Sequence, residues 1–377
     1  MTTSIGGTIG VTFPDGSIQA TAATGFGFKN RILNGAMILD QRNAGASVSV
    51  GTATGTYTLD RWRVYHDTAI TSNITAQQST TVPSSGYINS QVLTNGTTAT
   101  AAAGDVNVIQ QRIEGLNVTD LNFGSATAAN VALSFWVRSS LTGTFGVALS
   151  NGAQNRSYVS TYVINAVDTW EQKTVIVAGD QAGTWLTTNG IGLIASWDLG
   201  SGTSLETTAG AWQAGQYFRT SACASFINST GATLYITGVQ LEKGSTATSF
   251  DVRSYGTELA LCQRYYYRVG GGAGSSATAT RSTLGFGFSS TTTSVLIGVS
   301  LPVSMRASPT VSSGGTITVS GASYSAAPSA VDLNNGANLS MIELDITVAA
   351  STAALPRFVS VRTDTDADAF VDFSAEL

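Results

Sequence analysis

The sequence has few charged residues and no surplus of positive charge. Lys, Arg, Asp and Glu make up 11% of the 377 residues, lysine occurs only at Lys29, Lys173 and Lys243, and the formal net charge is −5. An ordinary soluble protein carries about 25% charged residues. Binding to nucleic acid requires clustered Lys and Arg that displace counterions from phosphates, and a polybasic membrane anchor requires them as well. The composition therefore argues against nucleic acid and anionic lipid as partners.

Long hydrophobic runs and cysteines are also scarce. No run reaches the roughly 18 apolar residues of a membrane-spanning helix, so no membrane insertion is expected. Cys223 and Cys262 are too few for a disulfide framework in so long a chain, and two buried thiols are favoured over a single disulfide. The first basic residue is Lys29, so the positively charged start of a secretion signal is missing and synthesis in the cytoplasm is expected.

Histidine occurs once, at His66, and this removes most zinc and hydrolytic chemistry. A zinc site with two His ligands is impossible, and the chain contains no Gly-x-Ser-x-Gly motif, P-loop or Cys-x-x-Cys motif. Glycoside hydrolysis needs only two carboxylates, for which Asp180, Asp198, Glu206 and Glu171 are candidates. The two aspartates stand where turns are expected, and turn capping explains them. We therefore predict no catalytic residues, no cofactor and no enzymatic activity, and leave open whether a metal is bound.

Gly, Thr, Ser, Ala and Val fill the sequence instead, which is the composition of an all-β protein with short turns. Between residues 26 and 254, segments with apolar residues at alternate positions recur between Gly-rich or Asn-rich turns. The predicted strands are 57–65, 106–113, 131–138, 158–164, 171–177, 191–197 and 234–241. About eight or nine strands over this length predict one jelly-roll β-sandwich, a carbohydrate-binding-like domain spanning 26–254.

A short arm is predicted at residues 1–25. Its centre is the sequence FPDGS at 13–17, in which Pro, Asp and Gly favour a tight turn, with hairpin arms at 11–13 and 18–20. A lone hairpin is barely stable in water, so we expect this arm to attach to another protein.

Two further units follow the jelly roll. Residues 255–276 are predicted to form a short helix capped by Thr257 and then a Gly-rich connector. Residues 277–377 are predicted to form a smaller C-terminal β-sandwich, whose strand candidates are 295–301, 316–320, 341–348, 358–362 and 370–373. This unit lacks tryptophan and has a thin core, so we expect it to gain stability by oligomerising.

All six tryptophans lie in the predicted jelly roll, between Trp62 and Trp212. Aromatic faces flanked by a few polar groups are typical of sugar-binding surfaces. The candidate sugar contacts are Trp136, Arg138, Trp197, Asp198, Trp212 and Gln213. Trp136 and Arg138 share the strand face opposite the apolar stripe, and the other two pairs lie near turns. For any single tryptophan, the alternative is a place in the core with a bonded indole N–H.

Several segments resemble tail-fibre and related receptor-binding proteins of tailed bacteriophages. They are VTFPDG (11–16), KNRILNG (29–35) with DQRN (40–43), YTLDRW (57–62), AGDQAGTWLTTNGIGL (178–193) and the run from YITGVQLEKG (235–244) to LCQRYY (261–266). Together they lie within residues 1–268, whereas residues 277–377 are similar to a fibre tip only in general character.

The resemblance implies a homotrimeric virion component that touches the host surface. It also implies that residues 1–25 attach to other tail or baseplate proteins. The middle domain is similar to carbohydrate-binding jelly rolls, which often carry calcium and an Asp before a Val-x-Leu strand pattern. Gly238 holds that place here, before Val239-Gln240-Leu241, which argues against a typical calcium site.

The predicted function is adhesion of a phage tail fibre to host polysaccharide or lipopolysaccharide without catalysis, by a protein made in the host cytoplasm and carried in the virion tail. The alternatives are a structural fibre or decoration protein with no sugar site, a cellular carbohydrate-binding adhesin module, and a polysaccharide-degrading tailspike. Whether the jelly roll or residues 277–377 carry the receptor site stays open.

Overall fold

The computed structural model describes residues 4–6, 10–12, 18–19, 28–51, 55–67, 74–83, 86–271, 283–321, 324–334, 339–349, 358–363 and 369–377. Strands dominate this part of the chain, which confirms the predicted all-β class. The helical segments found there are α1 (Tyr255–Gln263) and the 3-10 turns η1 (Gly115–Asn117), η2 (Thr119–Leu121), η3 (Thr203–Leu205) and η4 (Phe226–Asn228).

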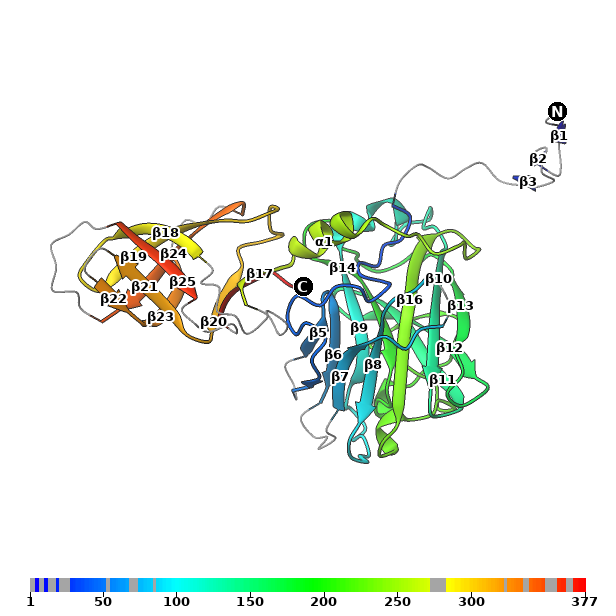
Figure 1. Ribbon diagram of the computed structural model, residues 1–377. Coiled ribbons are helices and arrows are strands. Elements are labelled where there is room, and N and C mark those ends of the chain that lie inside the picture. Colours follow the sequence, from blue (N-terminus) through cyan, green and yellow to red (C-terminus); the bar gives the residue numbers. More distant parts are fainter. Residues whose placement is uncertain are drawn as a thin grey trace.

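The larger unit is a jelly-roll sandwich of two antiparallel sheets, drawn in blue to green in Figure 1. Sheet I has the order β13-β10-β16-β8-β7-β4, and sheet II has the order β15-β12-β11-β14-β9-β6-β5. The strands are β4 (Val48–Ser49), β5 (Thr56–Leu59), β6 (Trp62–His66), β7 (Ile74–Ser79), β8 (Ser90–Asn95), β9 (Asn107–Glu114), β10 (Val131–Ser139), β11 (Gly143–Asn151), β12 (Arg156–Ile164), β13 (Glu171–Val177), β14 (Ile191–Asp198), β15 (Trp212–Ala214) and β16 (Thr233–Lys243). From β8 to β11 the chain alternates between the two sheets, as a jelly roll requires.

Alternating side chains fill the space between these sheets. In β10, Leu133, Phe135 and Val137 point inward and are at most 1% exposed. The ring of Phe135 lies 5.5 Å from that of Trp197 in sheet II, and Trp197 lies 5.6 Å from Trp62. The contact of Phe135 with Trp197 joins the two sheets at the centre of the core, and the contact of Trp197 with Trp62 lies within sheet II.

The sandwich differs from the strand prediction in several places. Residues 57–65, predicted as one strand, form the hairpin β5–β6, because Arg61 takes a left-handed conformation (φ 70°) in the turn between them. Strands β4, β7, β8, β11 and β15 have no counterpart in the prediction. In β11, which lies between β12 and β14, the inward Phe145, Val147 and Leu149 alternate with small residues.

The N-terminal segment contains β1 (Ser4–Gly6), β2 (Gly10–Thr12) and β3 (Ile18–Gln19), paired antiparallel in that order. The pairing of β2 with β3 agrees with the predicted hairpin, whereas β1 is an additional strand. The turn predicted at 13–17 lies outside the described residues.

The C-terminal unit is a smaller β-sandwich, drawn in yellow to red in Figure 1. Sheet III has the order β17-β26-β20, and sheet IV has the order β22-β21-β25-β18-β19-β24-β23. The strands are β17 (Tyr266–Gly270), β18 (Thr283–Ser289), β19 (Ser294–Ser300), β20 (Thr310–Gly314), β21 (Ile317–Gly321), β22 (Tyr324–Ala326), β23 (Pro328–Leu333), β24 (Met341–Val348), β25 (Phe358–Thr363) and β26 (Phe370–Ser374). Both sheets contribute to one core, which is aliphatic apart from a few residues such as Phe373.

Helix α1 leads directly into β17 at the junction of the two units (Figure 1). The helix begins one turn earlier than predicted, with Ser254 rather than Thr257 as its N-cap. The hydroxyl of Thr257 instead hydrogen-bonds that of Ser254, 2.8 Å away.

The residues after β26 return to the sandwich. The carboxylate of Glu376 accepts hydrogen bonds from Arg61 and, at 3.0 Å, from Arg42. The Leu377 carbonyl accepts from the Tyr57 hydroxyl at 2.8 Å. Arg61 is 2% exposed, so this junction contains a buried ion pair.

The remaining sequence-level expectations concern single residues. Cys223 and Cys262 are both buried free thiols. His66 is fully buried in β6, with Nε2 3.0 Å from the Val50 carbonyl oxygen, which is a structural role. In the described part of the chain, no helix has the length and hydrophobicity needed to cross a membrane.

Candidate functional site

The structure divides the six predicted sugar contacts among three places. Trp197 and Asp198 are each 1% exposed at the end of β14. A side chain buried to this degree cannot stack against a ligand in solvent, so the prediction is wrong for this pair. Trp197 points into the core between the two sheets, and the outer face of sheet II is covered by a cluster that contains Leu205 and Phe218.

Asp198 shapes the turn that follows β14. Its carboxylate accepts hydrogen bonds from the backbone N–H groups of Gly200 at 3.0 Å and Ser201 at 2.8 Å, and lies 3.4 Å from the Arg219 guanidinium. Burial raises the pKa of Asp198, and Arg219 and the turn hydrogen bonds oppose that effect. This residue is therefore a turn cap, the alternative weighed for it from the sequence.

Trp136 and Arg138 lie on the outer face of sheet I, as the alternation predicts. Both are half-buried, and each faces a β16 residue in register: Thr237 opposite Trp136, and Tyr235 opposite Arg138. The Arg138 guanidinium lies 4.8 Å from the Tyr235 ring centroid and forms a 3.0 Å ion pair with Asp168. An aromatic ring and a cation therefore share an outward face of the sheet.

A bulge in β16 brings a third aromatic residue onto this face. Gly238 has a φ of +60°, and a side chain there would collide with Tyr87 at 2.8 Å and with Trp136 at 3.0 Å. The missing Cβ lets both rings lie directly over the strand. Gly238 thus makes room for an aromatic pair.

Five half-buried aromatic side chains lie on this face, as two ring pairs with Trp136 between them. We name them the aromatic strip: Phe250, Tyr87, Trp136, Tyr235 and Trp170. Ring centroids are 5.6 Å apart for Phe250 and Tyr87 and 6.1 Å apart for Tyr235 and Trp170. Three polar residues that point outward beside the strip are exposed: Gln77, Gln172 and Thr174. An open sheet face with rings and amides is suited to a polar ligand with apolar faces.

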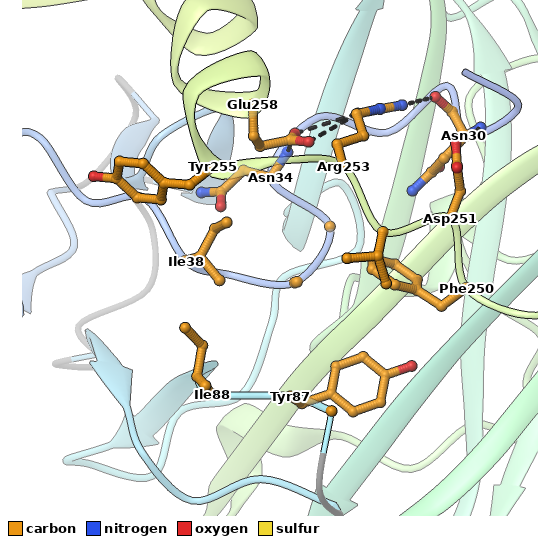
Figure 2. Close-up of a pocket in the computed structure, with 14 residues that line it drawn as sticks. Asn30, Asn34, Ile38, Tyr87, Ile88, Phe250, Asp251, Arg253, Tyr255 and Glu258 are labelled. Atoms are coloured by element: carbon orange, nitrogen blue, oxygen red, sulfur yellow. Dashed lines mark hydrogen bonds and ion pairs between the residues drawn. The ribbon is translucent and has the colours of Figure 1, made fainter. Parts of the chain in front are cut away.

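One end of the strip opens into a cavity of about 250 Å³ between sheet I, α1 and the loop after Lys29. Figure 2 shows Tyr87, Ile88, Phe250 and Ile38 around its lower part, with Arg253 and Glu258 above. The carboxylate of Glu258 forms a 3.2 Å ion pair with Arg253, and both side chains are buried. Because the charges neutralise one another, the cavity presents mainly apolar walls.

The other polar groups of this cavity are also engaged by the protein. The Asp251 carboxylate accepts from the backbone N–H groups of Lys29 at 3.0 Å and Asn30 at 3.2 Å. Asn30 Nδ2 donates to the Val239 carbonyl at 3.0 Å, and Asn34 N–H donates to Glu258. These bonds hold the KNRILNG segment against β16 and α1, so they build the cavity wall rather than present free acids or bases.

Trp212 and Gln213 lie elsewhere, on the edge strand β15 of sheet II. The Trp212 ring lies 5.3 Å from Trp185 and 5.8 Å from Phe123, and its indole N–H donates to the Ala178 carbonyl at 2.7 Å. Trp185 and Phe123 also line a cavity of about 240 Å³. This second aromatic cluster is separate from Trp136 and Arg138, so the structure does not bring the predicted contacts into one site.

The four carboxylates considered for hydrolysis are held by structural partners. Asp180 forms a bidentate pair with Arg156 at 2.9 and 2.5 Å. Glu206 lies 3.5 Å from Arg219, and Asp198 caps its turn. Partial burial opposes ionisation of Glu171, yet hydrogen bonds from Lys173 and the loop after β12 lower its pKa to about 2. A carboxylate held ionised in this way is a poor general acid at neutral pH.

Metal ligands do not gather in the part of the chain that the structure describes, where no group of three or more His, Cys, Asp or Glu side chains could hold an ion. Analysis of the sequence missed Tyr87, Tyr235, Phe250 and Trp170 as members of the candidate site. The signal available for Tyr235 was its alternation with Leu234 and Ile236, which places it on the outer face.

No protein-family model matches the sequence, and no curated protein sequence matches it significantly. Among solved structures, the chain is similar to the enzymatically active domain of tailspike protein 4 of bacteriophage CBA120, with 13% identity, a TM-score of 0.30, and coverage of 57% of this chain and 22% of that one.

Two binding modules are similar at the same level. A family 11 carbohydrate-binding module from Clostridium thermocellum, in complex with a β-1,3-1,4-mixed-linked tetrasaccharide, has 9% identity and a TM-score of 0.28, with 53% of this chain and 98% of that one covered. The N-terminal cellulose-binding domain of Cellulomonas fimi β-1,4-glucanase C has 12% identity and a TM-score of 0.23, with 54% and 91% covered. Likenesses this remote carry no argument about a ligand, and the jelly-roll assignment rests on the strand order given above.

Proposed function

We propose that the protein binds a glycan without catalysis, through the aromatic strip on the outer face of sheet I. The observation that carries this proposal is the row of rings from Phe250 to Trp170 on an open sheet face, with Arg138 and exposed amides beside it. Sheet II, in contrast, has its outer face covered by Leu205 and Phe218. Rings on an uncovered sheet provide the flat apolar area that the C–H faces of sugars need.

The chemistry of binding follows from these groups. Sugar rings would stack on Trp136 and Tyr235, while Arg138 and Gln172 donate hydrogen bonds to hydroxyl oxygens. Such contacts replace hydration that sugars already have, so each site should bind near millimolar, or about −4 kcal/mol. Several linked sites would raise the avidity by roughly two decades or more.

We further propose that this binding serves a virion tail fibre made of several copies, predicted as a homotrimer, in which residues 1–25 attach to other tail or baseplate proteins. The sequence segments KNRILNG, YTLDRW and AGDQAGTWLTTNGIGL support this role. The ligand would then be host polysaccharide or lipopolysaccharide. No step of hydrolysis is included, since the four candidate carboxylates all have structural partners.

A glycan array on the full-length protein, followed by titration of the best ligand, tests the site. Trp136→Ala should weaken binding by about tenfold or more, since stacking on one large aromatic ring is worth roughly 1–3 kcal/mol. Trp212→Ala is the matched control, because it removes a half-buried tryptophan from the second aromatic cluster. A folded Trp136→Ala protein with unchanged affinity would refute the proposal. Loss confined to Trp212→Ala would move the site to that cluster.

A further inference from the structure

In strand β18 of the C-terminal unit, large apolar residues point to solvent and a small residue points to the core. This is the reverse of what is expected in a monomer. Its sequence from residue 284 is LGFGFS. Phe286 and Phe288 point outward and are 56% and 58% exposed, whereas Gly287 between them faces the core. A strand with one solvated face normally places apolar residues inward and polar residues outward. This inversion suggests that the outer face of sheet IV is covered in the assembled protein.

Phe358 on the neighbouring strand β25 completes an apolar ridge. It lies opposite Phe288 in register and is 59% exposed. Its ring is stacked against that of Phe286 at 5.7 Å with an interplanar angle of 18°, and lies 5.8 Å from that of Phe288. The three rings contact one another rather than presenting one open plane, so the ridge is better suited to packing against protein than to stacking on sugar.

A depression lies beside the ridge on the next strand, β19. Gly298 is directly opposite Phe286, is exposed, and has no atom within 4 Å of the position a Cβ would take. A ring presented by an identical face would fit this depression. The face therefore carries both the projection and the recess of a self-complementary contact.

Charges on the two sides of the ridge differ in sign. Beyond β19, the outward positions of β24 are Met341, Glu343, Asp345 and Thr347. The two acidic residues face Gly298 and Leu296 in register. On β25, on the other side, the outward position beyond the phenylalanine ridge is Arg362. When two such faces meet about an axis parallel to the strands, the acidic side of one lies over the basic side of the other, whereas an axis across the strands would place like charges together.

The outer face of sheet IV is also large enough to supply most of a stable protein–protein interface. Seven strands at a spacing of about 4.8 Å, each about six residues long at roughly 3.3 Å per residue, cover about 670 Å² in projection. A stable interface of standard size buries about 800 Å² per partner. Sheet IV can therefore supply most of such an interface.

We propose that the outer face of sheet IV is the surface through which copies of this chain associate, with the ridge of Phe286, Phe288 and Phe358 at its centre. A self-complementary contact joins two chains about a two-fold axis, so this inference does not rest on the predicted homotrimer, and it is independent of the glycan site. It identifies the contact surface, the direction of the symmetry axis relative to the strands and the residues that determine the pairing.

Sedimentation velocity and mass photometry on the full-length protein test the face. The native protein should contain an even number of copies at micromolar concentration, a dimer in the simplest case. The double variant Phe286→Ser, Phe288→Ser should halve that number with an unchanged circular dichroism spectrum. Val163→Ser, at a 48% exposed valine in β12 of the sandwich, is the control and should keep the native number of copies. A native monomer would refute both the assembly of several copies and the face. A native trimer, or a double variant that keeps the native number of copies, would refute the face alone.

A charge exchange keeps the test valid if the serine variant does not fold. Glu343→Arg alone and Arg362→Glu alone should each raise the dissociation constant by about tenfold, because like charges then meet across the axis. The two changes in one chain, or an equimolar mixture of the two single variants, should restore association. Failure of both rescues would contradict the proposed orientation. Glycan affinity measured per site should be unaffected throughout, which separates this result from that of the strip.

Discussion

Two large aromatic side chains, Trp62 and Trp197, fill the centre of the sandwich, whereas three phenylalanines of the C-terminal unit lie on its outer face. The tryptophans are at most 1% exposed, and their rings lie 5.6 Å apart. Phe286, Phe288 and Phe358 are all more than half exposed, and the core beneath them is largely aliphatic. Aromatic area that is buried within a chain stabilises that chain, while area left outside stabilises only a contact.

The comparison implies that the two units depend differently on protein concentration. The sandwich has a deep core that joins both sheets, so its unfolding should not depend on other copies. The C-terminal unit leaves its largest rings outside, so association should add to its stability by mass action. Experiments that remove one ring, one ion pair or one charge can separate the two cases.

The largest expected effect is in the sandwich core. Trp197→Ala should lower the free energy of unfolding of the sandwich by about 4 kcal/mol, because it leaves a cavity between the two sheets. Denaturant unfolding followed by fluorescence measures this loss. The matched change Phe288→Ala should cost less than about 0.5 kcal/mol in a monomer, as is usual for surface positions. If the two variants lost the same free energy of unfolding, the buried tryptophan would stabilise the sandwich no more than the exposed phenylalanine stabilises the C-terminal unit, and the contrast would be refuted.

The second effect concerns the junction between the units. Glu376→Ala should cost about 3 kcal/mol, because Arg61 would stay buried without its carboxylate partner. Limited proteolysis and thermal unfolding of the full chain should show the C-terminal unit released from the sandwich. The exposed Asp120→Ala, away from both the junction and sheet IV, is the control and should leave the junction intact. Unchanged proteolysis of Glu376→Ala would show that Glu376 is not needed to hold the units together.

The smallest effect is a pH dependence at the same junction. Burial raises the pKa of Asp60 to about 6, although Arg42 nearby opposes the shift. A raised carboxyl pKa stabilises the folded state below the unfolded value near 4, and this contribution disappears as the pH rises through 6. The native protein should therefore lose about 2 kcal/mol relative to Asp60→Asn between pH 4 and pH 7.

Unfolding curves at several pH values measure this difference. The exposed Asp120→Asn provides the control, since its side chain is 44% exposed and lies away from the junction. If the free energy of unfolding changed with pH by the same amount in the native protein and in Asp60→Asn, Asp60 would titrate as an ordinary carboxyl, contrary to the prediction.

Alternation of apolar residues identified most strands, and two of them, β13 and β24, agree with the prediction at both ends. It placed Trp136 and Arg138 on an outer face for the same reason. It missed β18, because glycines occupy inward positions there and phenylalanines point outward. A period of two identifies the two faces of a strand but does not show which face a second copy covers.

The buried pair Trp197–Asp198 and the aromatic strip show a second limit of sequence analysis. Whether an outer face is open depends on loops far away in the sequence, such as the one that carries Phe218 over sheet II. The strip likewise joins Tyr87 to Phe250 across more than 160 positions, with Gly238 making the space. Such contacts follow from the sheet topology and leave no local pattern in the sequence.

The junction has a mechanical consequence. The C-terminal unit is held to the sandwich by the covalent path from α1 into β17, by the ion pairs of Glu376 just beyond β26 and by hydrogen bonds between Arg306 and Asn189. A sideways force at the far end of this unit acts as a torque on these attachments, and bending there requires Arg61 and Arg42 to separate from the carboxylate. The C-terminal unit should therefore move with the sandwich as one rigid body, so that a displacement of its far end is transmitted to the sandwich.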